Sequence, residues 1–151
     1  MAIREWIRYD LGLPRVSDAD LDALESGRQL TLPEEFRETL TAHAGDRPRP
    51  GVCPVGRGSV SVAEFFVVQA DRSGRSAYNV WHYLEAFDEL VPDAEKLIPF
   101  ASNGGQAIFA LDYRHGGVPG VSLVDLDLPE EPDAITPVAS DFSSWMGLLH
   151  D

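Results

Sequence analysis

The order of the secondary structure is decided by a central stretch that reads LIPFASNGGQAIFALDY over residues 97–113. Apolar and aromatic residues dominate its two ends, Leu97–Ala101 and Ala107–Tyr113, in runs of strand length. Between them, Asn103-Gly104-Gly105 suits a tight turn that requires positive φ angles. The stretch therefore predicts two consecutive β-strands with a short turn between them.

Further strands are predicted on both sides of this stretch. Toward the C-terminus they are Val121–Leu126 and Ile135–Val138, set apart by turn signals at Gly116-Gly117 and Pro129–Pro132. Toward the N-terminus, β-branched and aromatic residues predict a strand from Val60 to about Gln69. The strands thus gather in the latter half of the chain, after a turn-rich interruption at 71–76.

Helices are predicted mainly in the first third of the chain and at its end. A capping box at Thr31-Leu32-Pro33-Glu34 predicts the start of one helix, which Gly45 ends. The other predicted helices are Ile3–Tyr9, a helix capped by Ser17 that stops near Gly27, Tyr78–Leu90, and a C-terminal helix capped by Ser140. Asp46–Gly58 is predicted to be a loop because it holds three Pro and three Gly. This order predicts one α+β domain, 1–151, with an antiparallel sheet packed against helices.

The apolar residues of the predicted elements indicate the core. The aromatic side chains expected there are Trp6, Phe36, Phe65, Phe100, Phe109, Phe142 and Trp145. The single Cys53 excludes a disulfide framework and is expected to be a small buried hydrophobe. The N-terminus MAIREWIRYD has no apolar signal-peptide region, so a cytoplasmic location is expected.

Negative charge is unevenly spread along the 151 residues, whose formal net charge is −13. Residues 1–75 hold 12 acidic and 10 basic side chains, whereas residues 76–151 hold 13 acidic and two basic ones. The second half contains two acidic clusters: Glu85, Asp88, Glu89, Asp93 and Glu95; and Asp125, Asp127, Glu130, Glu131 and Asp133. The negative electrostatic potential of such clusters repels nucleic acid and anionic membranes and attracts a basic protein. The alternative is that these carboxylates serve only solubility.

No pattern of catalytic or metal-binding residues stands out. The four histidines, His43, His82, His115 and His150, are scattered without metal-ligand spacing, and His82 is expected to be a partly buried structural side chain. Asp125 and Asp127 would share a strand face, but the sequence places no third ligand beside them. No serine lies in a G-x-S-x-G motif. We therefore expect no enzyme activity, metal or cofactor; a hydrolase or metal enzyme would need a cleft joining His82 or His115 to carboxylates.

Three stretches, in this order, resemble the SMI1/KNR4 family, also called the SUKH superfamily. They are LPEEF at 32–36 running on to Gly45; LIPFA at 97–101 with GG at 104–105 and IFALD at 108–112; and GV at 120–121 with VD at 124–125 and VASDFSSWM at 138–146. The resemblance implies a mostly antiparallel, twisted sheet of about six strands flanked by helices. It places the family core at 31–149 and leaves an N-terminal helical segment at 1–30.

The resemblance also implies a role in binding. Many bacterial members resemble immunity proteins that block a toxin, often a nuclease, and eukaryotic relatives act as regulatory interaction proteins. We therefore expect a non-catalytic protein that neutralises a basic cognate toxin through an acidic surface. The expected contact residues are carboxylates from both clusters: Glu85, Asp88, Glu89, Asp93, Asp125, Asp127, Glu130 and Glu131. A regulatory or scaffold module for an endogenous protein is the alternative. The sequence leaves open the oligomeric state, which cluster binds, and whether 46–58 orders only with a partner.

Overall fold

The computed structural model describes residues 3–8, 15–69, 78–129, 131 and 134–151. Within these residues lie four α-helices, one 3-10 helix and eight strands. The helices are α1 (Asp18–Arg28), α2 (Glu34–His43), α3 (Val80–Leu90), η2 (Ala94–Lys96) and α4 (Phe142–Leu148). The strands are β1 (Glu5–Arg8), β2 (Asp46–Arg49), β3 (Val52–Val55), β4 (Gly58–Ser61), β5 (Leu97–Ser102), β6 (Ala107–Asp112), β7 (Gly120–Asp125) and β8 (Ile135–Ala139).

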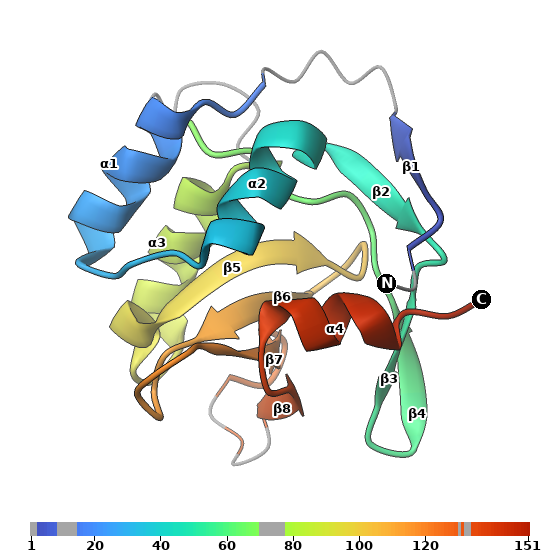
Figure 1. Cartoon of the computed structure of the whole chain (residues 1–151). Helices are drawn as coiled ribbons and strands as arrows, with labels where there is room; N and C mark the ends of the chain where they lie inside the picture. The colour runs from blue at the N-terminus through green and yellow to red at the C-terminus, as the bar shows by residue number, and fades with distance from the viewer. Residues whose placement is uncertain (1–2, 9–14, 70–77, 130, 132–133) are drawn as a thin grey trace.

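The antiparallel α+β fold is confirmed. The largest sheet has four strands in the order β5-β6-β7-β8, and β1-β2 and β3-β4 form separate two-stranded ribbons (Figure 1). The expected continuous strand from Val60 to Gln69 is wrong, because beyond β4 this segment makes only isolated bridges, Phe65 to Ala101 and Val67 to Asn79. It still covers the edge of β5, where the N–H of Phe66 donates to the carbonyl of Phe100 at 2.8 Å.

Aromatic side chains fill the core between α2, α4 and the sheet, as the sequence indicates. Phe36 of α2 meets Phe100 of β5 and Phe142 of α4 edge to face, with ring centroids 5.6 and 5.1 Å apart. Trp145 of α4 packs edge-on against Phe100 at 5.0 Å. These rings are almost wholly removed from water, which makes them a main source of hydrophobic stabilisation. Trp6 is only partly buried and packs against this cluster.

The expected helix at Ile3–Tyr9 is wrong: its described part forms strand β1, and the 1–30 segment is therefore not helical throughout. Across the ribbon Trp6 lies opposite Pro48, and the N–H of Arg4 donates to the carbonyl of Arg49 at 2.8 Å. An isolated helix this short is marginal in water, so pairing with a distant strand decides the conformation. Tyr9 lies outside the described residues.

The expected loop at Asp46–Gly58 is also wrong, because this segment forms β2, β3 and the start of β4. Its prolines are compatible with strands because each ribbon has only two strands, and an edge strand does not need every N–H for pairing. The tip of the β3–β4 hairpin holds Gly56 at a φ of 57°, a left-handed conformation that glycine adopts without steric cost. The predicted interruption at 71–76 lies outside the described residues.

Three helix starts test the capping predictions. Ser17 caps α1 in a full capping box, in which the Ser17 side chain accepts the N–H of Asp20 and the Asp20 side chain accepts the N–H of Ser17. The capping box predicted at Thr31 is absent, because α2 begins after Pro33 without a side-chain cap. The cap of α4 is Asp141 rather than Ser140, since the carboxylate of Asp141 accepts the N–H of Ser144 at 2.7 Å.

Candidate functional site

The described members of the two acidic clusters lie at opposite ends of the main sheet. The strand register places Leu97 opposite Asp112, and Ala107 opposite Asp125. Asp93 lies just before β5 begins, at the Leu97 end, whereas Asp125 ends β7 at the other end. The structure therefore does not bring the two clusters into one surface.

Some of the expected contact residues already have intramolecular partners. Asp88 accepts two hydrogen bonds of 2.9 Å from the guanidinium of Arg28, which joins α3 to α1. Asp125 accepts the backbone N–H of Asp127 at 2.9 Å. Glu85 also takes part in an intramolecular interaction. Glu85, Glu89, Asp93, Asp127 and Glu131 are exposed, and Glu130 lies outside the described residues.

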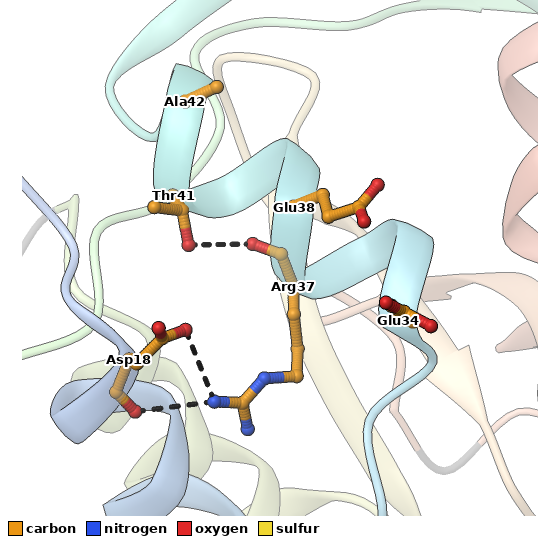
Figure 2. Close-up of a pocket in the computed structure, with 6 residues that line it drawn as sticks. All are labelled: Asp18, Glu34, Arg37, Glu38, Thr41 and Ala42. Carbon is orange, nitrogen blue, oxygen red and sulfur yellow. Dashed lines mark hydrogen bonds and ion pairs between the residues drawn. The ribbon is translucent and has the colours of Figure 1, made fainter.

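An open groove of about 430 Å³ lies between α1 and α2. Its lining is rich in acidic side chains and consists of Asp18, Glu34, Arg37, Glu38, Thr41 and Ala42. Figure 2 shows the side chain of Arg37 extending from α2 to Asp18 at the beginning of α1, while Glu34 and Glu38 extend from α2 itself. Among the described lining residues, the acidic Asp18, Glu34 and Glu38 thus outnumber the basic Arg37.

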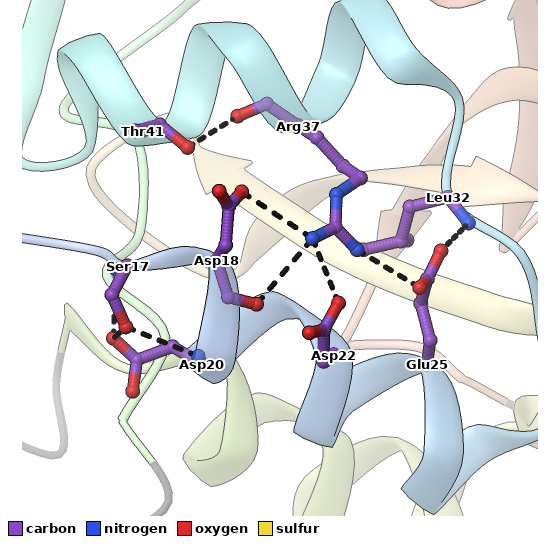
Figure 3. Close-up of polar contacts among 8 residues, drawn as sticks. All are labelled: Ser17, Asp18, Asp20, Asp22, Glu25, Leu32, Arg37 and Thr41. Carbon is purple, nitrogen blue, oxygen red and sulfur yellow. Dashed lines mark hydrogen bonds and ion pairs between the residues drawn. The ribbon is translucent and has the colours of Figure 1, made fainter.

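Arg37 is held by carboxylates of α1. Its guanidinium donates to Glu25 and to Asp22, each at 2.9 Å, and lies 3.4 Å from a carboxylate oxygen of Asp18 (Figure 3). These three acids are spaced four and three residues apart, which places them on one face of the helix. The hydrogen bond to Asp22 is the largest cause that raises the pKa of Arg37 above its usual value. The positive charge of Arg37 is therefore already neutralised, and the Arg37 side chain joins the two helices.

A second, smaller groove of about 180 Å³ lies on the other side of α2 and is lined by Trp6, Glu38, Thr39, Ala42, His43 and Met146. The rings of Trp6 and His43 stack at 4.3 Å, so this groove has an aromatic wall. Glu38 and Ala42 line both grooves. We call the exposed side of α2 between the two grooves, formed by Glu34, Glu35, Glu38 and Ala42, the α2 ridge.

The carboxylates of the α2 ridge form no ion pairs among the described residues. Most described arginines, in contrast, pair with carboxylates elsewhere: Arg4 with Asp151, Arg8 with Asp46, Arg28 with Asp88, Arg49 with Glu5, and Arg114 with Asp112. Because most described arginines are paired with carboxylates in this way, the remaining exposed charge is mainly negative.

Sequence reasoning missed the α2 ridge because the net charge of residues 1–75 is close to zero, at −2. The net charge does not show that arginines pair with acids that lie far apart in sequence, which leaves other acids without such a partner among the described residues. A local signal did exist, since Glu34, Glu35 and Glu38 recur at the spacing of one helix face, opposite Phe36 and Leu40.

The described residues offer little support for catalysis. His82 is exposed, which corrects the expectation of a partly buried side chain, and His115 is exposed as well. Among the residues with described positions, no group of three or more His, Cys, Asp or Glu could hold a metal ion. Cys53 is fully buried, and this burial raises the pKa of its thiol to about 11. Such a thiol is protonated at neutral pH and unreactive.

None of the described helices has the length and apolar character needed to cross a membrane.

An α+β domain with a closed aromatic core and carboxylates beside open grooves has the features of a protein-binding domain. Residues 15–147 match the SMI1 / KNR4 family (SUKH-1), and the chain belongs to this family. SUKH domains are generally non-catalytic, immunity-type domains that bind toxins. A search of curated proteins finds no match to this chain.

Proposed function

We propose that this chain is a cytoplasmic immunity protein that binds a cognate toxin and blocks it without catalysis. The toxin in this proposal is a basic protein of the nuclease type. The observation that carries the proposal is the distribution of charge on a member of the SUKH family. Most described arginines pair internally with acids, while many described carboxylates stay exposed. Surface charge of one sign favours a partner of the other sign.

The physical argument concerns what a nuclease surface must do. A protein that binds phosphate backbones presents Lys and Arg side chains, and an acidic protein competes for the same side chains. Opposite charges also accelerate the encounter, which a protein protecting its own cell needs. Affinity then depends on a packed centre within the interface, since exposed ion pairs contribute little by themselves.

The two acidic clusters enter this proposal as separate candidate contacts. A standard interface covers about 800 Å² on each partner, so one toxin surface need not reach both ends of the sheet. Glu85, Asp88, Glu89 and Asp93 form one candidate; Asp125, Asp127, Glu130 and Glu131 form the other. Charge alone does not rank them.

The test is a binding titration against the product of the gene beside this one, combined with a growth assay. We expect complex formation at micromolar concentrations or below, a Kd that rises with salt, and rescue of cells that express the neighbouring product. A toxic neighbour that forms no complex at low salt contradicts the proposal. Specific capture of a non-toxic housekeeping protein instead favours the regulatory alternative.

A further inference from the structure

We propose that the α2 ridge is the recognition surface of this protein and that it receives a basic segment of its protein partner. In this arrangement a Lys or Arg side chain of the partner enters the α1–α2 groove, and a neighbouring apolar side chain enters the Trp6–Met146 groove. The inference rests on the proposed function and specifies the surface that performs it.

The first argument is charge complementarity inside a concave surface. Glu34 and Glu38 line the α1–α2 groove and form no ion pair among the described residues. Arg37, the one basic side chain among the described lining residues, is bound by Asp22 and Glu25 at 2.9 Å each. A cation that enters the groove beside Glu34 and Glu38 therefore meets carboxylates, since Arg37 is already neutralised and the guanidinium of Arg15 lies at the Ala42 end of the helix.

The second argument is the polarity along α2. The guanidinium of Arg15 donates to the carbonyl of Ala42 at 3.3 Å, so positive charge lies near the C-terminal end of the helix. The negative charge of the ridge is consequently concentrated at Glu34–Glu38. Near Ala42 the smaller groove begins, with its wall of Trp6 and Met146. The surface thus has an acidic end and an aromatic end, which suits a partner segment that has a basic and an apolar side chain.

The third argument is rigidity. The Arg37 contacts fix α1 against α2, and Glu25 also accepts the backbone N–H of Leu32 at 2.7 Å, which fixes the connection between the helices. Phe36 and Leu40 on the opposite face of α2 are wholly buried. A partner therefore binds grooves that already exist, with a small loss of conformational entropy. Arg37 acts here as a positioning residue and makes no contact with the partner.

The first experiment uses hexa-arginine as the probe and follows the backbone amides of the ¹⁵N-labelled chain at low salt. We expect the shifts to concentrate at residues 18–22 and 34–42, with smaller changes at 85–95 and 125–131. The double variant Glu34→Gln/Glu38→Gln should weaken binding about threefold to fivefold. The matched control Glu5→Gln/Glu95→Gln, which removes the same charge from β1 and η2 at exposed positions outside the candidate contacts, should weaken it less than twofold. Absence of binding, or equal losses in both variants, overturns the inference.

The second experiment uses the toxic product of the neighbouring gene. We expect Glu34→Gln/Glu38→Gln to raise its Kd about tenfold and the control pair to leave it within twofold. Ala42→Gln places a longer, uncharged side chain where the two grooves meet and should also weaken binding, whereas Ser143→Gln on α4 should not. Wild-type binding that both glutamate pairs leave intact overturns this inference and leaves the proposed function standing. If the wild-type chain does not bind the product of the neighbouring gene but binds hexa-arginine at α2, the result contradicts the proposed function and not this inference.

Discussion

Arg37 and Glu25 form the central contact between α1 and α2, because the carboxylate of Glu25 accepts the Arg37 guanidinium with one oxygen and the backbone N–H of Leu32 with the other. Both side chains are largely shielded, with exposed fractions of 20% and 25%. A carboxylate held from two sides in this way couples a helix, the following turn and the next helix. The relationship explains how a chain with a large surplus of negative charge keeps two acidic helices side by side.

The first prediction is that Glu25→Gln destabilises the protein by about 1–2 kcal/mol, because a charge-assisted hydrogen bond is replaced by a neutral one. Urea unfolding followed by circular dichroism measures the change. Asp18→Asn is the control, since Asp18 lies 3.4 Å from the guanidinium and is 83% exposed. Its expected effect is within about 0.5 kcal/mol. Equal losses in the two variants would show that the α1–α2 contact does not depend on Glu25.

The second prediction concerns the start of α4. Asp141→Ala should cost about 1 kcal/mol, the usual loss for a helix N-cap, whereas Ser140→Ala should change the free energy of unfolding little. Hydrogen bonds from the backbone N–H and the hydroxyl of Ser144 lower the pKa of Asp141 below its ordinary value. The cap therefore contributes at neutral pH and is lost as pH falls through the folded-state pKa. The difference in free energy of unfolding between wild type and Asp141→Ala should accordingly become smaller in acid. A difference that does not change with pH argues against an ionised cap.

The third prediction concerns Asp112, a buried acid at the end of β6. Burial by itself raises the pKa of this carboxyl, but hydrogen bonds from Arg114 and from the hydroxyl of Ser122 outweigh it and leave the pKa lowered. The ionised form thus stabilises the fold above the ordinary pKa of 3.8, and this contribution disappears as pH falls through the lower folded-state value. Asp112→Asn should cost about 2 kcal/mol at pH 7 and flatten the acid limb of the stability curve. Asp127→Asn, an exposed change of the same kind, should leave that limb unchanged.

The fourth prediction concerns the single cysteine. Cys53 is fully buried and its thiol has a pKa raised to about 11 by that burial. Ellman's reagent at pH 8 should therefore label the native protein only at the rate of unfolding, and should react at once with about one equivalent in guanidinium chloride. Rapid labelling of the native protein would place the thiol at the surface and contradict the packing of β3 against α4.

Local patterns were sufficient for the main sheet and for the four described α-helices. The runs that became β5, β6, β7 and β8 are apolar, short and separated by turn residues, so their conformation follows from their own sequence. The same is true of α1, whose capping box satisfies its first N–H groups locally. The prediction of Ser140 as the cap of α4 failed because the adjoining Asp141 caps the helix, and only the backbone geometry shows which side chain reaches the free N–H group.

The N-terminal strand and the two ribbons depended on tertiary structure. Glu5 lies opposite Arg49, a partner 44 residues away, and no local pattern encodes a pairing of that range. The charge of the surface likewise depended partly on the sequence and partly on the fold. Counting residues was enough to show a surplus of negative charge, since ionisation depends on residue type. The fold decided which carboxylates remain available, because ion pairs such as Arg28 with Asp88 neutralise some acids. Glu34 and Glu38 form no ion pair within the described part of the chain and lie beside grooves that only packed helices create.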